Sequence, residues 1–163
     1  MVRTGPGRSD TAATAFADRM AMTFADLGFP RMAARVLFTL LVREDDEGMT
    51  ATELGDAIGA SPAAISGAVR YLGQFDLVAK RAVRGSRSVR YRLPPDAWYA
   101  AAASESRRYP MLVAMAEGGV MAAGGDSTTA GRRVAEMRDF FAFVATEMDG
   151  VLARWKARPQ DSG

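Results

Sequence analysis

One segment constrains the fold of this chain more than any other, and it covers residues 50–75. Thr50 and Glu53 have the spacing of a capping box, in which a hydroxyl begins a helix and a carboxylate follows three residues later. A short helix is predicted to end at Gly59, and Ser61, followed by proline, begins a second helix. Glycine adopts the left-handed backbone of a tight turn without steric cost. The segment therefore predicts a helix-turn-helix.

The apolar side chains of these two helices are spaced so that they share one buried face. The predicted shared core consists of Leu54, Ile58, Ile65, Val69 and Leu72. The opposite face of the second helix is then free to contact DNA, and its residues are Ser61, Ala63, Ser66, Gly67, Arg70 and Gln74, with Tyr71 at the margin. Small residues near the helix start favour entry into a major groove, and arginine can bond guanine or phosphate. For Ser61, a purely structural helix cap is an equally good interpretation.

A segment rich in arginine follows the second helix. Asp76 is the only acid between Arg70 and Arg92, a stretch that holds seven bases, although the net charge of the chain is only +2. Near residue 89 apolar and polar residues alternate as in a half-buried strand, and Gly85 marks a turn, so a hairpin with a basic tip is predicted. The hairpin residues expected at the DNA are Arg84, Ser86, Arg87 and Arg90. A charged strand edge that prevents aggregation is the alternative.

The segments on either side of residues 30–94 are predicted to be helical and to pair two copies of the chain. Residues 10–29 form one helix, with Phe16 and Met20 on its apolar face. Residues 95–158 are a longer helical region with a kink or break at Pro110. Its last helix repeats apolar residues at steps of three and four, which is typical of helix-to-helix packing. This seam consists of Val134, Met137, Phe141, Val144, Met148, Val151 and Trp155.

Composition excludes several classes of function. The chain contains no cysteine and no histidine, which removes thiol nucleophiles, disulfides, zinc sites built on these residues and triads with a histidine base. Composition does not exclude an enzyme that works through carboxylates, but no spacing of acids indicates a paired site. We therefore expect no catalytic residue, metal or cofactor. No apolar run has the length of a membrane span or the character of an export signal, so we expect a cytoplasmic protein without membrane contact.

The order of the predicted elements resembles MarR-type bacterial regulators over residues 16–93. Two further pieces, residues 95–99 (Pro-Asp-Ala-Trp-Tyr) and 137–141 (Met-Arg-Asp-Phe-Phe) with a terminal Arg154–Trp155, resemble the GbsR-type branch, whose founding member regulates glycine betaine synthesis. The hairpin lacks the Asp-Arg-Arg run common in typical MarR proteins, which favours that branch. The resemblance implies a repressor of transcription, although the residues do not decide between repressor and activator.

We therefore predict a mainly helical fold: a winged helix-turn-helix with a small β-hairpin wing, joined to a helical dimerisation region. Its parts are a disordered start (1–9), a dimerisation helix (10–29), the DNA-binding domain (30–94), the C-terminal dimerisation region (95–158) and a tail (159–163). The expected function is a homodimeric, sequence-specific regulator on double-stranded DNA that a small-molecule effector could release. Aromatic residues outside the DNA-contacting helix could line an effector pocket or pack in the core. A winged-helix module that binds protein or RNA is the alternative.

Overall fold

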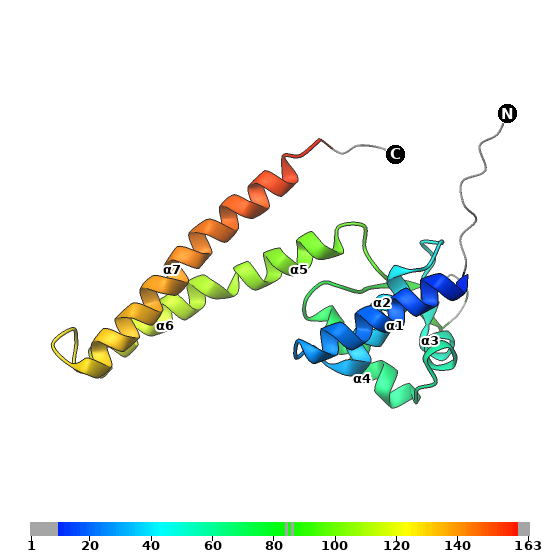
Figure 1. Ribbon diagram of the computed structural model, residues 1–163, viewed down its shortest axis with the longest axis horizontal. Coiled ribbons are helices and arrows are strands. Elements are labelled where there is room, and N and C mark those ends of the chain that lie inside the picture. Colours follow the sequence, from blue (N-terminus) through cyan, green and yellow to red (C-terminus); the bar gives the residue numbers. More distant parts are fainter. Residues whose placement is uncertain (1–9, 84, 86, 160–163) are drawn as a thin grey trace. The chain divides into compact units, whose positions relative to one another are not determined.

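The computed structural model describes residues 10–159 with the exception of residues 84 and 86. The predictions for residues 1–9, Arg84, Ser86 and residues 160–163 lie outside the described residues. The chain divides into two compact units, Met1–Ala97 and Trp98–Gly163 (Figure 1). None of the helices in the described part of the chain is long and apolar enough to cross a membrane.

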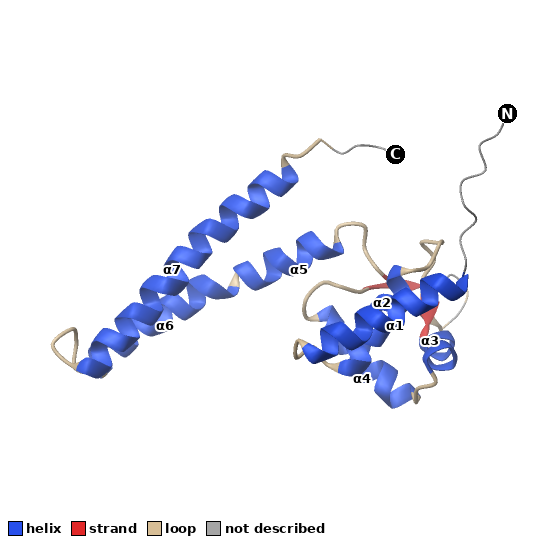
Figure 2. Ribbon diagram, viewed as in Figure 1, coloured by secondary structure: helices blue, strands red, loops and turns tan. Residues whose placement is uncertain are grey.

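The first unit combines helices with a small antiparallel sheet (Figure 2). Its described elements are α1 (Asp10–Asp26), α2 (Arg31–Leu41), β1 (Met49–Thr50), α3 (Ala51–Ile58), α4 (Pro62–Gly73), β2 (Ala79–Ala82) and β3 (Val89–Arg92). Strand β3 lies between β1 and β2 and pairs antiparallel with both. The β2–β3 hairpin confirms the predicted wing, whereas β1 was not predicted. Two residues are too few to show a strand's alternation.

Helix α2 holds the core of this unit because it contacts α1, α3 and α4. Leu37 and Phe38 of α2 are almost completely buried, and the predicted shared core of α3 and α4 is buried in full. Arg35, also on α2, donates a hydrogen bond from Nη2 to the carbonyl oxygen of Ile58 at 2.7 Å. A cation is favourable there because the last carbonyls of α3 carry a partial negative charge. The helix-turn-helix is thus fixed to α2 by apolar packing and by this bond.

The local signals of the helix-turn-helix are present in atomic detail. Thr50 Oγ1 accepts from the Glu53 N–H at 3.2 Å, and Glu53 Oε2 accepts from the Thr50 N–H at 2.7 Å, which completes the capping box. Gly59 ends α3 in the left-handed conformation, with φ 69° and ψ 45°. Ser61 caps α4 by accepting from the Ala64 N–H at 3.3 Å. A Cβ at Gly55 would lie 3.0 Å from the Ala60 carbonyl oxygen, so the turn approaches this glycine closely.

The second unit consists of three helices in its described residues: α5 (Ala97–Ser106), α6 (Arg108–Ala122) and α7 (Thr129–Lys156). Helices α6 and α7 lie side by side along much of their length (Figure 1). The break predicted at Pro110 occurs earlier, at Arg107, and Pro110 lies in the first turn of α6. A proline costs little there because first-turn N–H groups have no partner within the helix. Thr128 caps α7 by accepting from the Gly131 N–H at 2.9 Å.

Candidate nucleic-acid interface

Helix α4 has one face in the core and one face toward solvent. Ile65, Ala68, Val69 and Leu72 are buried. The solvent face comprises Ser61, Ala63, Ser66, Arg70 and Gln74, all exposed, and the half-buried Gly67. We call these six residues the reading face. Its first two turns carry only small side chains, so the N-terminal end of α4, where the helix dipole is positive, is open to close approach by an anionic backbone.

Arg70 is the cation of the reading face. Its side chain is exposed in the last turn of α4, and no carboxylate pairs with it in the part of the chain that the structure describes. An unpaired guanidinium on a helix can form two parallel hydrogen bonds to guanine or to a phosphate. The geometry therefore leaves Arg70 available for the contact that the sequence predicts.

Tyr71 differs from the other predicted DNA contacts because its ring is packed within the chain. The ring lies edge-on to Phe29, with centroids 5.3 Å apart, and tilted to Phe75 at 5.0 Å. Phe29 in turn meets Phe24 of α1, which also meets Phe38 of α2. Tyr71 thus belongs to an aromatic cluster that joins α1, α2 and α4. Phe24 and Phe29 therefore pack within the fold, which is one of the two interpretations that the sequence left open for the aromatic residues.

The wing presents its arginines unequally. Arg87 is exposed near the tip, where Gly85 has φ 77°. Arg90 is in the middle strand of the sheet, and its guanidinium is engaged within the chain: Nε and Nη2 donate to the Gly48 carbonyl oxygen at 3.2 and 2.9 Å. Nη2 also lies 3.2 Å from Oε2 of Glu53. The sequence predicted a DNA contact for Arg90, but an acid 37 residues earlier in the chain already faces it.

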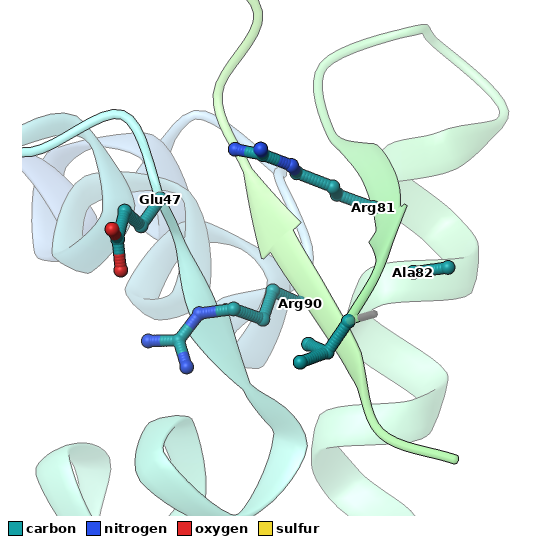
Figure 3. Close-up of a pocket in the computed structure, with 5 residues that line it drawn as sticks. Glu47, Arg81, Ala82 and Arg90 are labelled. Atoms are coloured by element: carbon teal, nitrogen blue, oxygen red, sulfur yellow. The ribbon is translucent and has the colours of Figure 1, made fainter. Parts of the chain in front are cut away.

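Arg81 was not among the predicted DNA contacts, although it lies in the same acid-poor stretch. It is exposed on β2 directly opposite Arg90 in the sheet register. Glu47, Arg81, Ala82, Val83 and Arg90 line a hollow at the base of the wing (Figure 3). Figure 3 shows the Arg81 side chain extended across the neighbouring strand. Two signals in the sequence could have pointed to Arg81 as a further exposed cation of the wing. It lies in the positively charged stretch, and the alternation of side chains along a strand could have placed it on the exposed face.

The charge on Glu53 depends on this arrangement. The hydrogen bond from the Thr50 N–H lowers the pKa of Glu53, and the nearby charge of Arg90 lowers it further, while partial desolvation acts in the opposite direction. Glu53 is therefore ionised at neutral pH, so the contact with Arg90 is an ion pair.

Comparison with known proteins decides the family. Residues 96–158 match the family model described as an MmpR5-like MarR family transcriptional regulator. Over 143 residues the chain is 34% identical to the HTH-type transcriptional regulator MmpR5 of Mycobacterium tuberculosis (strain ATCC 25618 / H37Rv), a match that covers 88% of this chain and 86% of that protein. The chain belongs to the MarR family of transcriptional regulators. A crystal structure of a transcriptional regulator, 32% identical, superposes on 90% of this chain and 99% of its own length with a TM-score of 0.81.

Membership of the MarR family confirms the predicted winged-helix fold and a regulator rather than an enzyme. The predicted apolar seam of α7 has two parts in the structure, one that packs on α6 and one that is exposed. Phe141 stacks on Tyr109 of α6, with ring centroids 6.0 Å apart, and Val134 lies against Gly119 of the same helix. This first part of the seam is used within the chain.

The second part of the seam has no such cover among the residues that the structure describes. Val151 and Trp155 are 46% and 56% exposed, and Met137 is exposed earlier on the same helix. Val144 and Met148 are half-buried. On α1, Phe16 is exposed and Met20 is half-buried. Apolar side chains are thus left at the surface on α1 and α7, as is Phe143 beside the seam.

Proposed function

We propose that this MarR-family regulator binds duplex DNA as a homodimer and recognises a specific operator sequence. Each subunit would place α4 in a major groove and its wing near the adjacent minor groove. The observation that carries the proposal is the reading face, where small side chains precede Arg70 on the solvent side of a helix whose other face is buried. Arg70 is exposed and has no carboxylate partner among the residues that the structure describes. A basic wing follows this helix directly in the chain.

From their chemistry, roles can be proposed for five of the six residues of the reading face. Ala63 would contact a thymine methyl group, and Ser66 a base edge or a phosphate. Arg70 would bond guanine or phosphate, and Gln74 lies one turn further along the same face. Gly67 allows close approach, and Ser61 caps the first turn of α4, whose positive end would face the phosphate backbone. On the wing, Arg87 would bond phosphate, and the sequence predicts the same role for Arg84 and Ser86.

Pairing through α7 and α1 would double the number of bases that one protein molecule reads. The exposed apolar side chains at the C-terminal end of α7 support this proposal because a lone chain leaves them in water. As a cytoplasmic repressor, the dimer would block transcription at its operator. A small-molecule effector that changes the separation of the two reading faces would release it, since a ligand shifts the balance between states that bind it differently. The similarity of residues 95–99 and 137–141 to the GbsR-type branch stays a prediction within this proposal.

Selection of bound fragments from genomic DNA, followed by footprinting, tests the proposal. The expected operator is a pseudo-palindrome whose half-site centres are about 10 bp, one helical turn, apart. Protection of a single asymmetric half-site by a monomeric protein at micromolar concentration would contradict it. Weak duplex binding with little preference among sequences would instead favour the alternative, a winged helix that binds RNA or protein.

A further inference from the structure

Arg90 joins the wing to the first helix of the helix-turn-helix. Its backbone lies on β3, opposite Thr50 of β1 in the sheet register. Its guanidinium reaches the Gly48 carbonyl just before β1 and the Glu53 carboxylate in the first turn of α3. Thr50 is at once the strand partner of Arg90 and the cap of α3. One side chain therefore holds together the middle strand of the wing, the short strand β1 and the start of α3.

The backbone at this junction leaves little freedom. Gly48 has φ 79°, and a Cβ built on it would overlap the backbone carbonyl of Tyr91, the residue next to Arg90. The segment before β1 thus runs in direct contact with β3. The guanidinium of Arg90 satisfies the Gly48 carbonyl at this close approach, and a planar group with several N–H donors can do so while also facing a carboxylate.

The charges around Arg90 also favour its contact with Glu53. Arg81 and Arg90 are directly opposite each other on neighbouring strands, a like-charge arrangement that destabilises a sheet. Ionised Glu53 beside Arg90 offsets this repulsion. The side chain of Arg90 is only 25% exposed, and its guanidinium lies beside the Gly48 carbonyl and the Glu53 carboxylate at the start of α3. Figure 3 shows both side chains extending toward the same side of the sheet, where they line one hollow together with Glu47.

We propose that Arg90 is a positioning residue that fixes the wing relative to α3 and α4, and that it makes no phosphate contact of its own. This inference rests on the proposed DNA-binding function and changes the role of one residue in it. An arginine that binds phosphate contributes to the salt dependence of binding, whereas one that holds the wing in place contributes to affinity alone.

The chain offers matched variants for a test. Glu53→Gln removes the charge that faces Arg90 but keeps an amide that can complete the capping box. Arg90→Lys keeps the positive charge but loses the planar group, and Arg90→Gln removes both. Arg87→Gln, at the exposed part of the wing, is the control for a phosphate contact. Affinity for the footprinted operator is measured over a series of KCl concentrations, at a temperature where circular dichroism shows each variant fully folded.

We expect Arg90→Gln and Arg90→Lys each to weaken operator binding by about tenfold, which corresponds to about 1.4 kcal/mol, with the salt slope of the wild type. Glu53→Gln should weaken binding similarly, and the double variant Glu53→Gln/Arg90→Gln no more than either single one, because both substitutions break the same contact. Arg87→Gln should instead reduce the salt slope by about 0.9. A purely structural role in stability would leave the affinity of folded variants unchanged and would overturn the proposal.

Two other results would also overturn the proposal. In the first, Arg90→Lys binds the operator like the wild type while the salt slope of Arg90→Gln falls by about 0.9. In the second, the losses of operator affinity in Glu53→Gln and Arg90→Gln multiply in the double variant. Hydrogen exchange of the Thr50 and Glu53 amides supplies a measurement without DNA. These amides should exchange faster in Arg90→Gln than in Arg87→Gln. Equal exchange in the two variants would contradict the positioning role of Arg90. A wild type that prefers no duplex sequence would refute the DNA-binding function, while this exchange measurement would still decide whether Arg90 holds α3.

Discussion

The ring of Tyr71 meets the ring of Phe29 edge-on, at a centroid distance of 5.3 Å and an interplanar angle of 87°. Tyr71 is on α4, beside the reading face, and Phe29 is in the connection between α1 and α2. This pair therefore fixes the orientation of α4 relative to the first two helices. An aromatic pair of this geometry stabilises by about 1 kcal/mol beyond the area that it buries.

Substitution of Tyr71 separates packing from DNA contact. Tyr71→Ala should lower the free energy of unfolding by about 2 kcal/mol, because it removes a half-buried ring and both of its aromatic contacts. Tyr71→Phe keeps the ring and should leave both stability and operator affinity close to those of the wild type. Urea denaturation and operator titration measure the two quantities. A stable Tyr71→Phe variant with reduced affinity would show that the hydroxyl contacts DNA, as the sequence suggested.

Gly48→Ala should destabilise the first unit strongly. Its Cβ would collide with the backbone of Tyr91, and the left-handed φ adds strain of about 1 kcal/mol. Gly73→Ala is the matched control, because nothing lies within 4 Å of a Cβ at this helical position. The control should gain up to about 1 kcal/mol, since alanine is the better helix former. Thermal melting compares the two, and equal melting temperatures would refute the close approach of Gly48 to Tyr91 of β3.

Arg70→Ala should reveal whether the reading face contacts bases. If Arg70 bonds a guanine, its loss should cost about 1–3 kcal/mol on the preferred operator and relax the preference at one position per half-site. If it bonds phosphate, the loss should be similar on all sequences, with a salt slope lower by about 0.9. Binding to a library of operator variants distinguishes these outcomes. Unchanged affinity on every duplex would remove Arg70 from the interface.

The proposed dimer is tested best at the exposed end of the seam. Val151→Asp with Trp155→Asp leaves the Phe141–Tyr109 stack intact, so each chain should stay folded while the pairing weakens by several kcal/mol. Phe141→Asp with Met148→Asp would also disrupt the packing of α7 on α6 and is therefore expected to unfold the second unit. Ala153→Asp, an exposed residue off the seam, is the control. Sedimentation decides the outcome: a dimer that persists in the Val151/Trp155 variant would place the interface elsewhere.

The contribution of Glu53 should depend on pH. Its pKa is lowered in the folded chain, by the Thr50 N–H first and by Arg90 second. Such a group stabilises the fold above its ordinary pKa of about 4.3, and the stabilisation is lost as the pH falls through the lower, folded value. Glu53→Gln should therefore be less stable than the wild type near neutral pH, and the difference should shrink below about pH 4. A difference that stays constant across this range would exclude the ion pair as its cause.

Sequence alone determined those features that depend on neighbours within one or two helical turns. The capping box of Thr50 and Glu53, the left-handed Gly59 and the Ser61 cap were all predictable, because each needs only a few consecutive residues. The buried face of α4 followed from its periodicity. The three-four spacing likewise predicted that α7 packs through a seam, but not which helix covers it.

Tertiary structure decided whatever depends on residues far apart in the chain. Strand β1 is ordered by pairing with β3 about 40 residues later, and no periodicity can show in two residues. Part of the α7 seam packs on α6 of the same chain, since the turn at Gly124 and Gly125 brings these helices together. Arg90 and Arg87 are alike in sequence, with no acid nearby in either case. Only the folded chain places Gly48 and Glu53 beside Arg90, because hydrogen bonds and ion pairs depend on distance in space and not on separation along the chain.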